Sequence, residues 1–331
     1  MSFTILDQDT VTSNILRDIS SAQPGADTGT DSDNGVRAAA TGSAVEGLYE
    51  HQAWIARQIF PDTADSDIRA LHARLRGLSK KVAVPASGTI QLNAAPNSKA
   101  TAGLLVLLGD GTQYQTTADA IAGADGTVVV TAAAVVAGSA GDVEAGTPLT
   151  ISSPPPGYAA EGSIVSMVGG TDDETDEGLL ARLLDVIRNP PAGGNAYDFR
   201  RWAMSVDGVT AAYVYPLRRG LGTVDIVITS SGGLPSADTI SAVQTYIDSV
   251  RPVTAKNALV LAPTIVQINH DINIAGLTIA VGTPLIQAGL AAYFAGLAPG
   301  DSYVKSKAEA IVSDISGITE RQIVTPNGNS V

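Results

Sequence analysis

The chain lacks several residue types on which common activities depend. Its 331 residues include no cysteine, so neither a disulfide scaffold nor a thiolate metal site can form. The three histidines, His51, His72 and His270, lie far apart, and none has a second ligand at i+4. A polar stretch at residues 31–35 begins like a calcium loop, but its glycine comes too early, and Gly42 occupies the place of the bidentate glutamate. We therefore expect no bound metal.

Motifs for nucleotide binding and nucleophilic catalysis are also missing. The sequence has no P-loop pattern, no G-x-G-x-x-G that opens a helix and no G-x-S-x-G. These absences predict that the chain is not an enzyme and needs no cofactor. One enzymatic alternative stays open, a polysaccharide-acting enzyme with paired carboxylates. The separation of such a pair, roughly 5–9 Å, is a property of the tertiary structure and cannot be read from sequence.

Positive charge is in short supply. With 20 basic and 33 acidic residues, the formal net charge is −13, which disfavours a nucleic-acid partner. No apolar run approaches the roughly 20 residues of a membrane span, and no basic segment followed by an apolar run opens the chain. We expect a soluble protein made in the cytoplasm, without membrane insertion. An acidic, β-rich bacterial surface or adhesion protein is a second alternative, although such a protein needs an export signal.

The hydrophobic patterning predicts an α+β, multidomain chain. Residues 1–80 read as a helical segment and residues 81–170 as a small antiparallel β-domain. Residues 171–263 and 264–331 read as mixed α/β layers, the first with an antiparallel sheet and the second possessing two helices between two strands.

Helices are expected in the first segment from Thr10 or Thr12, from about Gly35 to Ile59, and after a cap at Asp65. Two apolar stripes at helical spacing run along the second and third helices. They would either close a small bundle or await helices of another chain. The residues that we expect at a partner interface are Val45, Leu48, Tyr49, Trp54, Ile55, Ile59, Phe60, Leu71 and Leu75.

In the β-domain, Asp-Gly turns at residues 109–112 and 124–127 separate alternating strands. The acidic run Asp172–Glu177 then precedes a helical pattern at residues 178–187, and its carboxylates are expected to cap that helix. Further on, strands at residues 209–215, 223–229 and 258–261 enclose a helix at 236–250. In the last segment we expect strands at 266–274 and 318–324, with helices at 284–297 and 304–316.

The most informative stretch is the signature segment, residues 187–257. Two prolines end a helix, two glycines allow positive φ, and Asn195 caps the next helix. A strand that ends in Tyr-Pro and a later Arg-Pro-Val-Thr-Ala follow. We take this segment to be scaffold. Its structural residues are Pro190, Pro191, Gly193, Gly194, Tyr215, Pro216, Arg251 and Pro252.

In this order, the signature resembles the baseplate J family of contractile phage tails, in the manner of the Mu and T4 wedge proteins. The likeness extends to G-L-Y-E-H-Q-A-W-I-A-R-Q-I-F-P-D-T-A at residues 47–64 and G-D-G-T-Q-Y-Q-T-T-A-D-A at 109–120. It also includes A-G-S-A-G-D-V-E-A-G-T at 137–147 and the acidic run with the helix after it. Family members commonly continue with a closing strand where this sequence ends, at residues 327–331.

The resemblance implies a structural role in a phage tail or a related contractile injection particle. Such proteins form baseplate wedges, with two copies pairing with a tail protein I-like partner. The wedges join into a six-fold ring that links sheath, hub and tail-fibre assemblies, alongside a lysozyme-like wedge protein, and that rearranges on contraction. The expected location is the virion tail baseplate, after assembly in the cytoplasm of the host bacterium.

Overall fold

A computed structural model describes residues 5–325 of the chain. The chain divides into two compact units, which are described separately. The first unit runs to Lys80 and includes Thr175–Arg188, and the second comprises Lys81–Glu174 and Asn189 onward. The predicted α+β, multidomain fold class is confirmed. The stretch at residues 327–331, where the family commonly adds a closing strand, lies outside the described residues.

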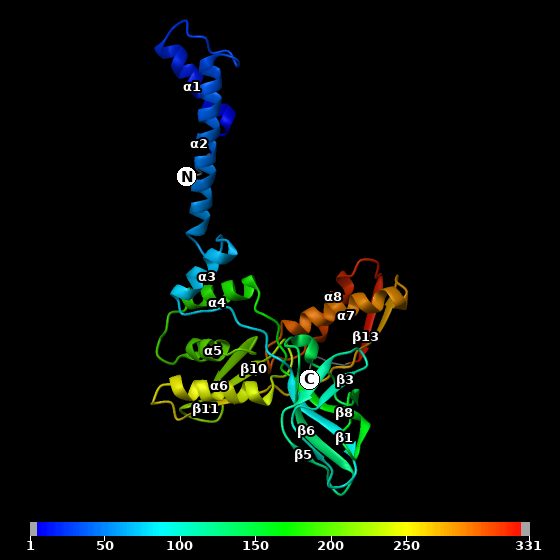
Figure 1. Cartoon of the computed structure of the whole chain (residues 1–331). Coiled ribbons are helices and arrows are strands. Elements are labelled where there is room, and N and C mark those ends of the chain that lie inside the picture. Colours follow the sequence, from blue (N-terminus) through cyan, green and yellow to red (C-terminus); the bar gives the residue numbers. More distant parts are fainter. Residues whose placement is uncertain (1–4, 326–331) are drawn as a thin grey trace. The chain divides into compact units, whose positions relative to one another are not determined.

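Four helices form the first unit: α1 (Gln8–Ala22), α2 (Asp33–Gln58), α3 (Ser66–Leu75) and α4 (Asp176–Arg188). Helix α1 folds back against the first half of the long α2 (Figure 1). The two backbones approach closely because α2 presents Gly42 there. A Cβ at Gly42 would lie only 2.9 Å from the Gln8 carbonyl oxygen.

The helix starts differ from those expected in this unit. Asp7, rather than Thr10 or Thr12, caps α1 through the Thr10 N–H, and Ser32 caps α2 through the Gly35 N–H. Aspartate and serine are strong N-caps, and the apolar pattern alone did not reveal these earlier residues. Helix α3 packs on α4, where Ala73, Leu179 and Leu183 are buried.

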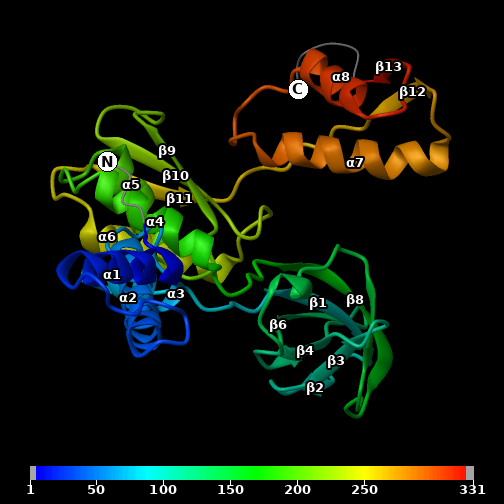
Figure 2. The same cartoon turned by 90° about the horizontal axis from the view of Figure 1, so that it is seen from above.

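In the second unit, six antiparallel strands close into a barrel of order β1-β6-β4-β3-β7-β8 (Figure 2). The strands are β1 (Ser87–Ala94), β3 (Leu105–Leu108), β4 (Gln113–Thr116), β6 (Thr127–Ala134), β7 (Pro148–Ile151) and β8 (Tyr158–Val168). A small pair, β2 (Lys99–Ala100) with β5 (Ala120–Ile121), and the 3-10 turn η1 (Ser139–Gly141) complete it. Its core contains Ile90, Leu92, Val106, Tyr114 and Met167.

The Asp-Gly turns lie where the sequence predicts them, with φ of 92° at Gly111 and 77° at Gly126. The sequence did not reveal that the barrel closes. Closure depends on the pairing of β1 with the long strand β8, whose register shifts between Thr89 and Ile90. Opposite Leu92, a Cβ at Gly162 would meet the Gln91 carbonyl oxygen at 2.6 Å, so glycine permits the close approach of the two strands.

The next layer comprises α5 (Ala196–Met204), β9 (Ala211–Pro216), β10 (Thr223–Thr229), α6 (Ala237–Val250) and β11 (Asn257–Leu261). The antiparallel sheet that the sequence predicts here is confirmed for one strand pair and wrong for the other. Strands β9 and β10 are antiparallel, but β10 and β11 are parallel. Helix α6 carries the chain back along the sheet between them, which is the usual connection for parallel neighbours.

The last part of the chain pairs β12 (Asp271–Ala275) with β13 (Glu320–Thr325), which pack with α7 (Ile279–Ala295) and α8 (Lys305–Asp314). Two expectations are corrected here. Strand β12 begins five residues after Val266, and α7 begins before Pro284 and includes it. Proline removes one helical hydrogen bond, which the packing of Ile286 and Leu290 outweighs. Across residues 5–325 no helix has the length and apolar character that a membrane crossing needs.

Candidate assembly interface

Apolar side chains are exposed along the second half of α2. Leu48 is 62% exposed, Ile55 46% and Ile59 60%, whereas Val45 is half-buried. Helix α1 covers only the first half of α2, where Gly35, Ala38 and Gly42 are buried. The predicted stripe is therefore present on the surface of the first unit. Its role as a partner interface stays a prediction.

The corner between α2 and α3 is held by a polar network. The Trp54 indole N–H donates to Asp65 Oδ2 at 2.7 Å, and the Gln58 amide donates to the same oxygen at 3.2 Å. In return, Gln58 Oε1 accepts from the Asp65 N–H at 2.8 Å. Asp65 occupies the N-cap position of α3, but its side chain serves this network instead of capping the helix. Phe60, 63% exposed, lies at this fixed corner.

The remaining predicted interface residues are exposed or half-buried. Leu71 and Leu75 on α3 are exposed. Tyr49 is half-buried on α2. Trp54 stacks on His51 with ring centroids 5.5 Å apart and keeps about a third of its surface exposed.

The signature segment brings Gly194 against Pro252, residues that are far apart in the sequence. Gly194 has φ of 115°, and a Cβ there would lie 2.4 Å from Pro252 Cγ. Gly193 also has positive φ, 84°, but a Cβ there would meet nothing within 4 Å. Both glycines therefore allow the positive φ of the turn, and Gly194 also allows the close contact with Pro252.

Asp198 organises this turn from within. Its buried carboxylate accepts hydrogen bonds from the backbone N–H groups of Gly194 at 2.7 Å, Ala192 at 3.1 Å and Asn195 at 3.3 Å. Arg201 donates to it at 3.1 Å, and Asn195 completes a capping box. Burial opposes ionisation of the carboxyl, but the three N–H donors and Arg201 together hold the Asp198 pKa below its usual value.

We expect Asp198→Asn to cost about 3 kcal/mol in the free energy of unfolding, because it removes the charge from several charge-assisted hydrogen bonds. The lowered pKa gives Asp198 a stabilising contribution above its unfolded pKa. That contribution is lost as pH falls through the folded value. Urea unfolding at pH 7 and in acid should therefore show the two proteins converging as pH falls. A difference in stability that is independent of pH would contradict this role.

The other signature residues are also in structural contacts. Tyr215 Oη donates to the Pro299 carbonyl oxygen, and the Arg218 guanidinium lies 5.9 Å above the Tyr215 ring. Pro216 ends β9. Arg251 holds the Arg-Pro-Val-Thr-Ala turn through Asp248 at 2.9 Å and the Ala255 carbonyl at 2.6 Å. Pro190 and Pro191 are exposed beyond the end of α4.

The acidic run Asp172–Glu177 was expected to cap α4 with its carboxylates, but the cap hydrogen bond comes from Thr175. Thr175 Oγ1 accepts from the Gly178 N–H at 3.1 Å, and Asp176 and Glu177 lie in the first turn of α4. Asp172 instead accepts from the Ser139 N–H, and Asp173 accepts from the Ala83 N–H at 2.8 Å. The Asp172 and Asp173 carboxylates therefore bond to backbone N–H groups of loops and do not cap α4.

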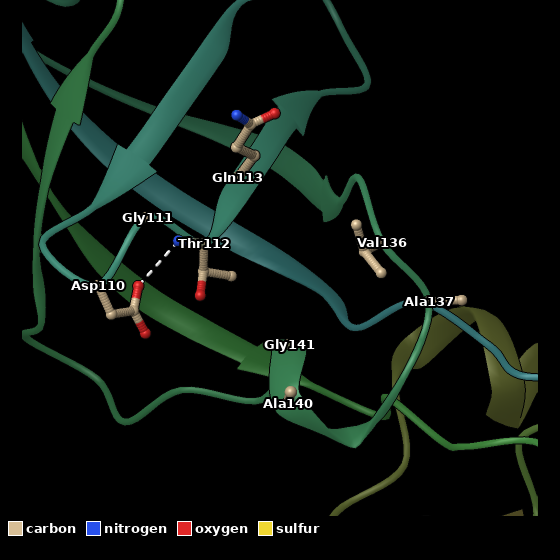
Figure 3. Close-up of a pocket in the computed structure, with 8 residues that line it drawn as sticks. All are labelled: Asp110, Gly111, Thr112, Gln113, Val136, Ala137, Ala140 and Gly141. Carbon is tan, nitrogen blue, oxygen red and sulfur yellow. Dashed lines mark hydrogen bonds between the residues drawn. The ribbon is translucent and has the colours of Figure 1, made fainter.

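Two observations on the described residues bear on metal binding and on pockets. Across residues 5–325, no group of three or more histidines, aspartates and glutamates is placed to hold a metal ion. A recess of about 530 Å³ lies on the barrel between Asp110–Gln113, Val136–Ala137 and Ala140–Gly141 (Figure 3). Asp110 is the one carboxyl in its lining, and its pKa is lowered because it accepts the Thr112 N–H. This lining contains no acid–base pair.

Two family models match parts of the second unit. Residues 89–170 match the model of the baseplate J-like protein barrel domain, and residues 191–262 match the baseplate J-like central domain. The barrel match coincides with the closed barrel β1–β8, and the central match begins at the second proline of the signature.

Relatives are similar over most of the chain. The Mu-like prophage FluMu protein gp47 of Haemophilus influenzae is 30% identical over 296 residues, covering 86% of this chain and 83% of that protein. Baseplate protein gp47 of Escherichia phage Mu is 30% identical over 293 residues, covering 85% of this chain and 81% of that protein.

Among solved structures, a chain of the anti-feeding prophage baseplate is 13% identical, with a TM-score of 0.39. The match covers 95% of this chain and 85% of that chain. The identity and coverage of the sequence relatives confirm the resemblance found in the signature: the chain belongs to the baseplate J-like family of phage baseplate proteins.

Proposed function

We propose that the chain is a structural subunit of the wedge in a contractile tail baseplate, and that its first unit joins it to other wedge chains. The observation that carries this proposal is the exposed apolar stripe of Leu48, Ile55 and Ile59 on α2, continued by Phe60 at the corner. Covering side chains of this size contributes on the order of 1.5–3 kcal/mol each. Exposed apolar side chains of this size, gathered on the half of α2 that α1 leaves uncovered, are typical of an assembly surface.

The corner network strengthens this proposal because it fixes how the stripe is presented. Trp54, Gln58 and Asp65 hold the end of α2 to the start of α3, so less side-chain freedom is lost when a partner binds. The partners that we propose are a second copy of the chain and a tail protein I-like protein, both inferred from the family. We also retain the four segments 1–80, 81–170, 171–263 and 264–331 as proposed domains.

In this proposal the wedges join into a six-fold ring in the virion tail baseplate. The ring links the sheath, the hub and the tail fibres, alongside a lysozyme-like wedge protein, and it rearranges when the sheath contracts. Assembly in the host cytoplasm belongs to the same proposal. The relative from phage Mu, named a baseplate protein, supports the location.

We further propose that the chain catalyses no reaction and holds no metal. The support is the sequence, which has no cysteine and only three scattered histidines. Elemental analysis of the purified chain checks the second part, because zinc or calcium at one atom per chain would contradict it.

The proposed role is tested by producing the contractile particle with and without this chain and viewing both by negative-stain electron microscopy. Without the chain, we expect tubes and sheaths that lack an organised baseplate. The same chain supplied from a plasmid should restore the baseplate. Normal baseplates in its absence would refute the proposal.

A further inference from the structure

One end of the layer formed by β9, β10 and β11 is positively charged and apolar, in contrast to the acidic character of the chain. Residues 191–262 contain six of the 20 basic residues of the chain but only five of its 33 acidic residues. The turn between β9 and β10 and the loop that leads into β11 lie together at this end, which we call the basic tip. Its exposed side chains are Leu217, Arg218, Leu221, Val253 and Lys256.

Backbone hydrogen bonds fix the two loops of the basic tip. The Gly220 N–H donates to the Leu217 carbonyl oxygen at 3.0 Å, and the Leu217 N–H donates to the Thr223 carbonyl oxygen at 2.8 Å. The second loop is joined to the first by the Lys256 N–H, which donates to the Gly222 carbonyl oxygen at 2.9 Å. Because these bonds already order the backbone in the free chain, little freedom of the loops is lost when a partner binds.

The apolar side chains of the basic tip gain little burial within their own chain. Leu217 has a φ of 63°, in the left-handed region that residues with a Cβ rarely adopt, and its side chain is 57% exposed. Leu221 is 85% exposed, and Val253 is fully exposed. Strained backbone conformations of this kind concentrate at binding sites, and exposed aliphatic side chains that lie together mark a surface for a partner.

The basic tip also presents positive charge that the chain does not neutralise. Two aspartates at this end of the layer, Asp225 and Asp248, are each engaged by an arginine of the same loops. Arg218 and Lys256, in contrast, form no ion pair with a carboxylate of residues 5–325, and the Arg218 guanidinium lies over the Tyr215 ring instead. Complementary charge across an interface steers association and selects the partner. The basic tip is therefore complementary to a segment that carries carboxylates beside an apolar side chain.

We propose that the basic tip binds an acidic segment of another baseplate protein. The segment places carboxylates beside Arg218 and Lys256 and an aliphatic side chain against the three apolar residues of the tip. The proposal rests on the proposed wedge function and adds a contact that is separate from the stripe on α2. A protein segment is favoured over a nucleic acid or an anionic membrane because the net charge of −13 repels both, and a phosphate backbone gains nothing from exposed aliphatic side chains.

A photoreactive residue at position 221 identifies what covers the basic tip. The amino acid p-benzoylphenylalanine replaces Leu221 during synthesis in the producing cell, and purified particles are irradiated, digested and measured by mass spectrometry. We expect one dominant crosslink, to a segment of another protein in which aspartate and glutamate outnumber lysine and arginine. A crosslink to a neutral or basic segment, or no crosslink to another protein, would overturn the proposal.

The charges are tested by combining Arg218→Glu with Lys256→Glu. Both side chains are exposed, so the urea midpoint of the purified chain should stay unchanged. The yield of the crosslink from position 221 should fall roughly tenfold or more, because attraction becomes repulsion. Lys99→Glu with Lys307→Glu is the matched control, since it makes the same change in formal charge at exposed positions outside the tip. This control and the charge-conserving pair Arg218→Lys with Lys256→Arg should keep the crosslink. An undiminished yield in the charge-reversed protein would contradict recognition by charge.

Two further measurements separate this contact from other ligands and from the wedge function. The purified chain is sedimented with vesicles of phosphatidylcholine and phosphatidylglycerol and is titrated with duplex DNA, and we expect binding to neither. Binding to either one that Arg218→Glu with Lys256→Glu abolishes would make the acidic protein segment the wrong occupant. Normal baseplates in particles that lack the chain would refute the wedge function. If those baseplates are lost but position 221 yields no crosslink to another protein, the wedge function stands and the proposal for the basic tip fails.

Discussion

Replacing Leu48, Ile55 and Ile59 together by glutamate is expected to abolish baseplate assembly while leaving the free chain folded. The three side chains are exposed in the isolated chain, so the triple variant should unfold within about 1.5 kcal/mol of the wild type. In an interface the same carboxylates would have to be buried without partners, at a cost of several kcal/mol. That cost lowers the association constant by roughly 100-fold or more.

The control is a charge-matched double variant on the other side of α2. Ser43→Glu with Arg57→Glu changes the formal charge by the same three units, and both positions are exposed. At about 100° per residue, Arg57 lies roughly 200° around the helix from Ile55. Electron microscopy of particles should show baseplates with the control and none with the triple variant. Assembly by both, or by neither, would mean that the effect does not depend on the stripe.

Gly194→Val is expected to destabilise the second unit by about 3 kcal/mol or more. Two effects add at this position. Positive φ strains any residue that has a Cβ, at about 1–2 kcal/mol, and a β-branched side chain more so. In addition, the new Cβ would lie 2.4 Å from Pro252 Cγ, so the turn or the Arg-Pro-Val-Thr-Ala loop must move.

Gly193→Val isolates the first effect. Gly193 has positive φ but open space, so its substitution should cost only the backbone strain, about 1–2 kcal/mol. Urea unfolding of both variants measures the difference, and assembly should fall together with stability. Equal costs would show that the contact with Pro252 is unimportant. Unchanged stability of Gly194→Val with lost assembly would make the turn a contact surface and not scaffold.

Turns and helix caps could be predicted from the sequence because they depend on neighbouring residues. The Asp-Gly turns at Gly111 and Gly126 require positive φ, and the cap at Asn195 is a property of the residues beside it. The sequence analysis predicted β11 to be antiparallel to β10, but the two strands are parallel. The direction of β11 depends on the end of the sheet at which α6 delivers the chain, and this is a tertiary property. Likewise, the local preference of proline for the first turn predicts a helix that starts at Pro284. The helix instead begins at Ile279, because tertiary packing in the last part of the chain outweighs that preference.

The candidate site shows the same division. Helical spacing identified the apolar residues of α2, since periodicity is local, but it did not show which half α1 would cover. The contact of Gly194 with Pro252 and the bonds of Asp172 and Asp173 to distant N–H groups join residues that are far apart in sequence. No motif in a single sequence specifies such contacts. The role of Asp198 could have been predicted from one local feature. It lies three residues after the cap Asn195, at the position where a capping box has an acidic side chain.

The central claim is that the stripe on α2 is covered by a partner in the baseplate. Because the chain has no cysteine, an Ile55→Cys variant carries a single thiol at a position that is 46% exposed in the isolated chain. The measurement is its rate of reaction with a maleimide reagent, first in the purified chain at a dilution that keeps it monomeric, and then in assembled particles. We predict rapid labelling in the free chain and strong protection in the particle. Equal rates in the two states would contradict the account.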